Sequence, residues 1–294
     1  LYIMFRTAIT FFILFFATGN TFAQLQLFAD SVIKGSSDSV RQQYQLKLTH
    51  AMNNFLATEQ SFSTSFDTIP SISTVISSDG LIRFYQWVQP NLETKTYSIY
   101  GMMQVKDKKT KTIKNYTLTD GAMDKYTASD KILNTDNYFA AIYYSIISLK
   151  ENKKTIYTLL GWRGVDNRTT VKTIDVLHFQ KNKPVFGKKI FKAPANMLPV
   201  MSAEKCTRVI FQYNAQAVMS LKYYSKGKKI VFDHLSPPKA TLKGAEETYG
   251  PDFTYDAFIW KKGKWQGKSD VDIRSSHNTD GQKITPVKDS ELRK

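Results

Sequence analysis

A change of hydrophobic period at Pro70 is the feature that most constrains the fold of this chain. Beyond it, residues 97, 99, 101, 103 and 105 alternate with their neighbours at 96, 98, 100, 102 and 104 in a period of two. A period of two places successive side chains on opposite faces of a strand. A second strand is expected at 81–88, after a turn at 78–80. The region after Pro70 is therefore predicted to be built from β-strands.

Further strands are expected in short apolar and aromatic stretches, most of them bounded by Gly, Asn, Asp or Lys. They are 113–118, 155–161, 171–179, 207–214, 217–224, 229–233 and 254–260. Short strands joined by tight turns favour antiparallel pairing. Residues 136–149 are ambiguous, since the aromatic run at 138–144 fits a helix or a buried strand, and we interpret them as a short helix that runs into an extended segment. We expect a mainly β (α+β) fold, with antiparallel sheets forming a sandwich or a partly open barrel.

An amphipathic helix is expected before this region, within residues 24–58. Its apolar stripe repeats every four residues, at Val40, Tyr44, Leu48 and Met52. Its opposite, polar face carries Arg41, Gln42, Gln45 and Asn53. Ser36, Ser37 and Asp38 are suitable N-cap residues. Packing of the apolar stripe on a sheet is the expected role, and docking of a partner is the alternative.

The N-terminus indicates export. Arg6 is followed by ten residues, 8–17, of which nine are apolar, and the small residue Ala23 follows later. This is the pattern of a cleaved signal peptide, and the run is too short to cross a bilayer. With only one cysteine, Cys206, no intrachain disulfide can form, which fits the bacterial envelope better than animal secretion. We expect a periplasmic or secreted protein with no transmembrane segment after cleavage.

These features divide the chain into four parts. Residues 1–23 are the expected signal peptide, and 24–70 form a helical segment packed on the main domain. Residues 71–265 form the antiparallel β domain, and 266–294 form a polar tail that is expected to have little regular structure.

The chain is strongly basic, with 41 Lys and Arg against 25 Asp and Glu and a formal net charge of +16. Such a balance favours anionic partners. The lysines gather in short runs between apolar stretches, at 106–109, 153–154, 181–183, 226–229 and 261–264. We interpret these runs as solvated hairpin turns that also guard sheet edges. Because 33 of the basic residues are Lys and specific phosphate recognition uses the Arg fork, no specific nucleic-acid binding is predicted.

Four residues are candidates for acid–base catalysis. Asp233 and His234 follow a predicted strand, while Asp252 and Asp256 lie four residues apart in an extended segment. Such pairs can move protons in a reaction. However, the chain has no G-x-S-x-G nucleophile motif and no H-x-x-x-H zinc spacing. A structural role is therefore the preferred interpretation for all four, and no metal or cofactor is predicted.

Aromatic and basic side chains suggest a second kind of site. Trp162 and Arg163 lie between two glycines in a connection between strands, where they could stack on a sugar or clamp an anion. The glycines could equally serve only a tight turn. Trp87, on the strand predicted at 81–88, is a further binding candidate.

A series of short segments follows a recognisable order along the chain: 79–80 with 83–87, 100–104, 157–162, 174–177, 184–187, 208–213, 230–235 and 255–258. This order is similar to that of a group of uncharacterised exported proteins of Bacteroidetes. The resemblance spans roughly residues 75–265. The resemblance implies a secreted or periplasmic location, and it supplies no activity, cofactor or catalytic residue.

Two hypotheses on function follow. The first is a non-catalytic envelope protein that binds an anionic envelope polymer or another envelope protein through an aromatic, basic surface. The alternative is a hydrolase of unfamiliar type that uses Asp233 and His234 with Asp252 or Asp256, and it requires His234 and a carboxylate to line a common open pocket. A third idea is binding to anionic lipid, which would require a single dense lysine face.

Overall fold

The computed structural model describes residues 21–194, 197–198 and 206–272. The expected signal peptide lies outside this part of the chain except for residues 21–23, and so does the expected tail beyond 272. Residues 21–34 are helical, and α2 (Asp38–Leu56) follows. As predicted, Ser37 is the N-cap of α2, and its Oγ accepts a hydrogen bond from the backbone N–H of Val40 at 3.3 Å.

The described strands form three largely antiparallel sheets, and the mainly β prediction is confirmed. The first sheet has the order β1 (Ser73–Ile76), β2 (Ile82–Pro90), β3 (Tyr97–Lys106) and β4 (Ile113–Leu118). The middle sheet has the order β10 (Val209–Asn214), β7 (Thr169–Gln180), β6 (Lys154–Gly164) and β5 (Ile142–Glu151), with β8 (Lys183–Phe186) paired to β7. The third has the order β11 (Leu221–Tyr224), β12 (Lys229–Ser236), β13 (Gly250–Lys261), β14 (Lys264–Lys268) and β9 (Phe191–Lys192). Among the described residues no sheet closes into a barrel.

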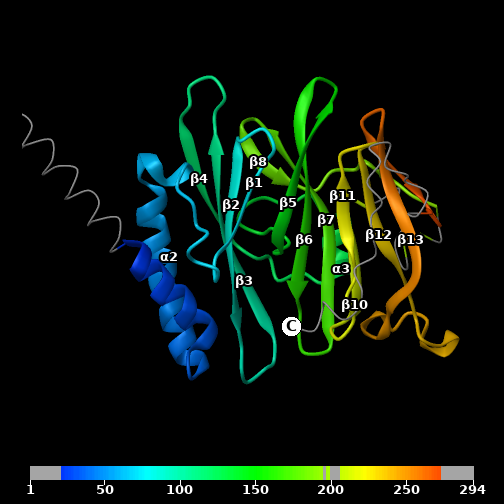
Figure 1. Ribbon diagram of the computed structural model, residues 1–294, viewed down its shortest axis with the longest axis horizontal. Helices are drawn as coiled ribbons and strands as arrows, with labels where there is room; N and C mark the ends of the chain where they lie inside the picture. Colours follow the sequence, from blue (N-terminus) through cyan, green and yellow to red (C-terminus); the bar gives the residue numbers. More distant parts are fainter. Residues whose placement is uncertain (1–20, 195–196, 199–205, 273–294) are drawn as a thin grey trace, which may run out of the picture.

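The three sheets are stacked face to face, with the helices as a further layer (Figure 1). On β6, Tyr157 and Leu159 belong to the core shared with the first sheet, whereas Ile156 and Leu160 belong to the core shared with the third. The middle sheet is thus buried on both faces. This two-sided burial gives an extended sandwich, which resolves the choice between sandwich and barrel.

The first sheet is also covered on both sides. The period of two predicted over 96–105 divides the side chains of β3 between two cores: Ile99 and Met103 face the middle sheet, while Met102 faces the helices. On β2, Phe84 likewise faces the middle sheet, while Tyr85 faces the helices.

The polar face predicted for α2 requires correction. Arg41 and Gln45 are buried at 7% and 3% exposure. The Oε1 atom of Gln45 accepts a hydrogen bond from Trp87 Nε1 at 2.6 Å, and Arg41 Nη1 donates to the backbone oxygen of Pro90 at 3.1 Å. Because β2 supplies polar partners at these positions, both side chains can be buried without an unpaired group.

Two other boundaries differ from the predictions. The helix expected at the start of 136–149 is absent: residues 136–141 are turns and irregular structure, and β5 begins at Ile142. Aromatic residues in this segment are drawn into the sheet core, where Tyr143 is fully buried. The polar tail expected from 266 begins later, because β14 extends to Lys268.

A fully buried ion pair lies within the middle sheet. Asp175 on β7 and Arg208 just before β10 are both 0% exposed, and Arg208 Nε donates to Asp175 Oδ2 at 3.0 Å. Arg208 Nη1 also donates to the backbone oxygens of Ala128 and Lys131, and the Tyr143 hydroxyl contacts the same carboxylate oxygen at 3.3 Å. The pair ties α3 (Lys125–Asp130) and the segment after it to the sheet.

Replacement of Asp175 by Asn should lower the free energy of unfolding by about 3–5 kcal/mol, because it leaves the Arg208 guanidinium buried without its counter-charge. Urea unfolding followed by circular dichroism measures this. The matched control is Lys188→Ala, which removes the partly exposed pair of Lys188 with Glu151 (3.1 Å) and should cost at most about 1 kcal/mol. If Asp175→Asn and Lys188→Ala lowered the free energy of unfolding by the same amount, the buried pair of Asp175 and Arg208 would not have the stabilising role proposed for it.

His178 on β7 should make stability depend on pH. Its ring is 7% exposed, and burial lowers the pKa of His178, with Lys188 adding to the effect and Glu151 and Asp175 opposing it. The folded state therefore favours the neutral ring. The neutral His178 ring contributes its full stabilisation above about pH 6.5, the pKa of histidine in the unfolded chain. This stabilisation is lost as the pH falls through the lower pKa of His178 in the folded state. Urea unfolding from pH 8 to pH 5 should show this loss, and His178→Gln should reduce it. An unchanged pH profile in the variant would refute the assignment.

Candidate functional site

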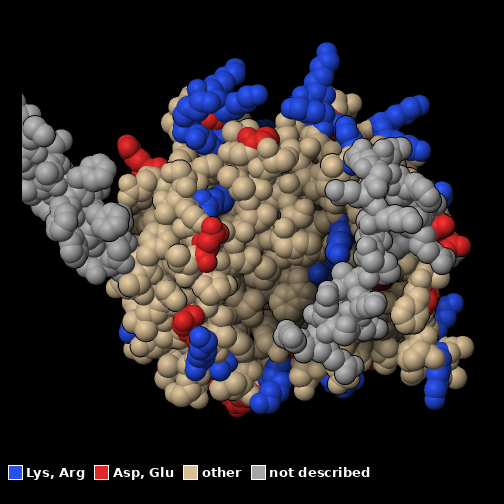
Figure 2. Space-filling view, viewed as in Figure 1, with Lys and Arg blue, Asp and Glu red and all other residues tan. Residues whose placement is uncertain are grey.

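The lysine-rich runs are turns, as predicted, and the fold brings them to one end of the molecule. We call this region the lysine end. It comprises residues 77–81, 106–114, 150–155, 179–183, 187–189, 224–229 and 260–264. In Figure 2 lysine and arginine side chains project from the top of the view, over the β3–β4 and β5–β6 turns. The sequence does not reveal this gathering, since it depends on the direction of strands in three separate sheets.

Contacts between turns join the lysine end across all three sheets. The Tyr157 hydroxyl at the start of β6 donates to Asp79 in the β1–β2 turn at 2.9 Å. Lys188 pairs with Glu151 of the β5–β6 turn, and a Cβ added to Gly263 of the β13–β14 turn would lie 3.3 Å from Glu151 Cγ. The β11–β12 turn joins the same surface, because the Trp260 N–H donates to the Lys228 carbonyl at 2.9 Å.

The lysine end holds nearly all of the net charge of the chain. It contains 18 lysines, three acidic residues and no arginine, a balance of +15 against +16 for the whole sequence. Fifteen of these lysines are exposed. The opposite end (residues 91–96, 165–168, 214–218 and 237–250) has four basic and four acidic residues. The charge of this protein is therefore polarised along its strands.

Several of these lysines occupy strained backbone positions. Positive φ angles are found at Lys111 (62°), Lys153 (66°), Lys181 (48°), Lys228 (46°) and Lys262 (48°). A side chain with a Cβ costs roughly 1–2 kcal/mol in this conformation, which Gly adopts freely and Asn tolerates. Lysine at these positions is thus a poor choice for stability, and strain of this kind concentrates at functional sites.

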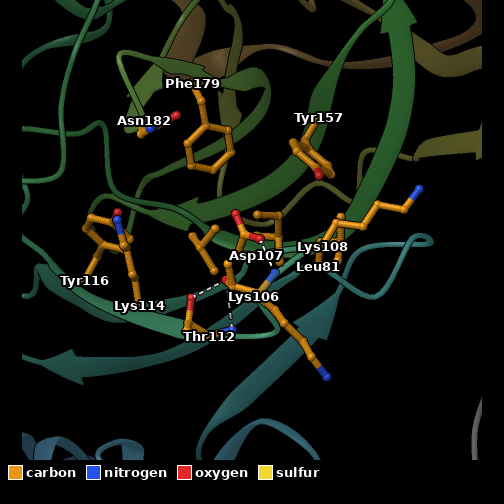
Figure 3. Close-up of a pocket in the computed structure, with 13 residues that line it drawn as sticks. Leu81, Lys106, Asp107, Lys108, Thr112, Lys114, Tyr116, Tyr157, Phe179 and Asn182 are labelled. Atoms are coloured by element: carbon orange, nitrogen blue, oxygen red, sulfur yellow. Dashed lines mark hydrogen bonds between the residues drawn. The ribbon is translucent and has the colours of Figure 1, made fainter.

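A pocket of about 440 Å³ opens at the lysine end between the first and middle sheets. Figure 3 shows Tyr116 of β4 on one side of it and Phe179 and Asn182, from the end of β7 and the turn after it, on the other. Tyr157 closes a further wall, and Lys108 and Lys114 lie at the rim. The binding candidates predicted from the sequence include none of these residues. The lining residues come from separate segments of the chain, and only the folded structure brings them together.

The acid–base candidates meet only in part. His234 Nδ1 lies 2.9 Å from Asp256 Oδ2, and His234 Nε2 lies 4.0 Å from Asp252 Oδ2. A bulge produces this arrangement, since residues 252–254 of β13 lie opposite His234 alone. Asp256 is 2% exposed, whereas the His234 side chain is 28% exposed. A carboxylate that holds Nδ1 in this way fixes the orientation of the ring.

Asp233 lies apart from this group. Its Oδ2 accepts a hydrogen bond from the Ser220 backbone N–H at 2.7 Å, because neighbouring residues of a strand point to opposite faces. Burial raises the pKa of Asp233, and the charge of Asp252 acts in the same direction. A second pocket of about 390 Å³ lies near β13, at Tyr249 and Pro251, but neither pocket includes His234 or its carboxylate neighbours.

The other sequence candidates have structural partners. Arg163 Nη2 pairs with Asp120 at 2.8 Å, and its Nη1 donates to the Ala140 carbonyl at 3.0 Å. Trp162 is half-buried at the same strand end. Trp87 is 2% exposed under α2, so it is a core residue and not part of an accessible surface.

Across the described residues, no three His, Cys, Asp or Glu side chains are grouped so that they could hold a metal ion. The helices in this part of the chain include none with the length and apolar character needed to span a membrane.

Comparison with known proteins gives no identification, because no protein-family model, curated protein or solved structure matches the chain.

Proposed function

We propose that this protein is a non-catalytic binding protein of the bacterial envelope and that its lysine end binds an anionic envelope polymer. The observation that carries the proposal is the collection of 18 lysines and only three acidic residues at one end of the fold. A surface of one charge attracts polyanions over a distance of about 8–10 Å at physiological ionic strength. Because the opposite end carries equal numbers of basic and acidic residues, a polyanion should be attracted mainly to the lysine end.

The composition of the lysine end favours a polymer with spaced charges over sequence-specific nucleic-acid binding. Its cations are all lysines, which act as mobile point charges, whereas the planar fork of arginine is suited to bidentate phosphate recognition. The charges also extend over turns from all three sheets. An extended chain with repeated carboxylate or phosphate groups can contact many of them at once.

Exposed apolar side chains favour a polymer over a lipid surface. Large hydrophobic residues near the lysine end that are exposed include Ile76 and Tyr224, at 49% and 47%. The most exposed, Phe253 and Val218 at 91% and 86%, lie elsewhere. Membrane-surface binding combines basic charge with a buried apolar face, and this end presents little apolar surface to insert.

Export is part of the proposal. It is supported by the apolar N-terminus after Arg6, by the single cysteine and by the resemblance to exported proteins of Bacteroidetes. A periplasmic or secreted location would place the lysine end among acidic envelope polymers.

The alternative is a hydrolase that uses His234 as a base oriented by Asp256, with Asp252 near its second nitrogen. The hydrogen bond of 2.9 Å to a buried carboxylate favours this candidate, whereas the two pockets described above do not include His234, which the hydrolase requires. In such a reaction His234 Nε2 would take a proton from water as the water oxygen attacks the carbonyl carbon of an ester. It would return the proton to the alkoxide oxygen as the bond from the carbonyl carbon to that oxygen breaks, which releases the alcohol and the acid. Hydrolysis of nitrophenyl esters that is lost in His234→Ala but kept in the lysine variants below would favour this alternative over the binding role.

Neutralising three turn lysines should weaken polymer binding. We expect Lys153→Gln, Lys181→Gln and Lys262→Gln together to reduce affinity for polygalacturonate by roughly tenfold or more at low salt, because each lysine near an anionic surface contributes about 1 kcal/mol. The dependence of affinity on salt should also become less steep. Isothermal titration calorimetry at several salt concentrations measures both.

The matched control removes three exposed lysines from the opposite end: Lys95→Gln, Lys239→Gln and Lys243→Gln. It changes the net charge equally and should leave affinity within about twofold if binding is local. Equal losses in the two triple variants would contradict a localised site. Absence of binding to both polygalacturonate and polyphosphate at low salt would overturn the proposal, and tighter binding to phosphatidylglycerol vesicles would assign the lysine end to lipid.

A further inference from the structure

We infer that the pocket at the lysine end is a subsite for one anionic sugar unit of the bound polymer. This inference rests on the proposed function and adds the class of ligand that the site selects. Its basis is the combination, in one pocket of about 440 Å³, of aromatic walls, hydrogen-bonding groups and rim lysines. Pockets of roughly 300–1,000 Å³ are typical of small-molecule sites, and this one opens in the middle of the charged surface.

Aromatic rings supply the flat surfaces that a sugar ring needs. Tyr116 and Phe179 are half-buried, so each presents part of its ring to the pocket, and Figure 3 shows them on opposite sides. Tyr157 is held by its hydrogen bond to Asp79 and is 4% exposed. Burial raises the pKa of Tyr157, and the adjacent Asp79 carboxylate raises it further, so the hydroxyl remains a neutral donor. The Tyr116 and Phe179 rings therefore give the pocket aromatic walls, which suit the C–H face of a pyranose, and the Tyr157 ring behind them is fixed in orientation.

Polar groups for sugar hydroxyls lie on the same pocket. The carboxylate of Asp107 accepts hydrogen bonds from the backbone N–H groups of Lys109 and Thr110, each at 2.8 Å. These bonds lower the pKa of Asp107 and keep it ionised. A carboxylate has more acceptor positions than these two bonds occupy. Asn182 adds an amide that both donates and accepts, and Thr112 completes the polar side of the lining.

Lysines at the rim make a charged sugar a better ligand than a neutral one. Lys108 and Lys114 are exposed lining residues, and Figure 3 shows the Lys108 side chain extended outward from the pocket, whereas the Lys106 ammonium lies 5.5 Å from the Phe62 ring centroid. Their long side chains can bring an ammonium group to a carboxylate or phosphate on a sugar inside. Asp107 supplies the single carboxylate of the lining, which can accept hydrogen bonds from sugar hydroxyls. Because it would repel a carboxylate or phosphate of the sugar, that anionic group should lie toward the rim lysines.

A nucleotide is the competing ligand, since a base could also stack on these rings. The lining contains no arginine, and the pocket continues into a surface made only of lysine turns. Nucleotide phosphates and bases are commonly held by arginine forks and stacked guanidinium groups, which are absent from this set of lining residues. We therefore assign the pocket to an anionic sugar and include the nucleotide in the test.

The test compares trigalacturonate, its neutral counterpart galactotriose, and uridine monophosphate by calorimetry on the whole protein. Tyr116→Ala should weaken trigalacturonate binding by roughly tenfold, because it removes one stacking wall. The Tyr116→Phe variant should bind trigalacturonate as tightly as the native protein. This result would show that the ring of Tyr116 is required for binding and that its hydroxyl is not. Tyr224→Ala is the matched control, since this exposed aromatic lies at the lysine end but outside the pocket, and it should have no effect.

Galactotriose should bind at least roughly tenfold more weakly than trigalacturonate if the rim lysines select the charge. Equal binding of the two sugars would overturn the anionic part of the inference. Tighter binding of uridine monophosphate, or normal trigalacturonate binding in folded Tyr116→Ala, would overturn the sugar subsite itself. Thermal unfolding of each variant shows that it is folded.

The two proposals fail in different ways. If the turn-lysine variants weaken binding of long polygalacturonate but Tyr116→Ala does not, the lysine end binds polyanions without this subsite. If Tyr116→Ala weakens trigalacturonate binding and the turn lysines have no effect on the polymer, the pocket is a site of its own and the surface proposal is wrong.

Discussion

Burial of the middle sheet on both faces is the constraint on which the rest of the structure depends. Side chains of β6 and β7 contribute to two separate cores, one shared with the first sheet and one with the third. The first sheet is enclosed in turn by the helices. The strands of the middle sheet are therefore largely withdrawn from solvent, whereas β11, β13 and β14 of the third sheet keep exposed residues. The buried pair of Asp175 and Arg208 fixes the middle sheet to α3 and the segment after it. Much of the accessible chemistry therefore lies at the ends of the strands.

The two ends of the stack differ in charge, and this difference is the basis of the functional proposal. Turns of all three sheets place lysines at one end, five of them in the left-handed backbone conformation. Glycine or asparagine would relieve that strain. We interpret the retained lysines as stability given up for a binding surface, as is common where function and stability compete. The aromatic pocket between the first two sheets adds selectivity to a surface that would otherwise recognise charge alone.

The period of two at 96–105 predicts its strand correctly, because neighbouring side chains of a strand point to opposite faces, as Met102 and Met103 do. The prediction from sequence fails at the start of 136–149, where a run of aromatic residues fits a helix or a buried strand and only packing decides, whereas the extended segment expected after it is present as β5. Arg41 and Gln45 were assigned to a polar face because their partners, Pro90 and Trp87, lie far away in the sequence. The lysine runs were identified as turns, but local sequence cannot show that the turns of three sheets converge. Tyr116, Phe179 and Asn182 form the pocket only through that convergence.

The most direct test of this account replaces strained lysines by glycine. Lys153→Gly, Lys181→Gly, Lys228→Gly and Lys262→Gly in one variant should raise the free energy of unfolding by roughly 2 kcal/mol, since the relief of left-handed strain at each position is partly offset by the greater backbone entropy that glycine gives the unfolded chain. The same variant should lose most of its affinity for polygalacturonate. Lys95→Gly, at the opposite end with a φ of 59°, should gain stability without loss of binding. A four-lysine variant that is more stable and binds the polymer as tightly as the native protein would contradict the claim that these lysines are kept for binding.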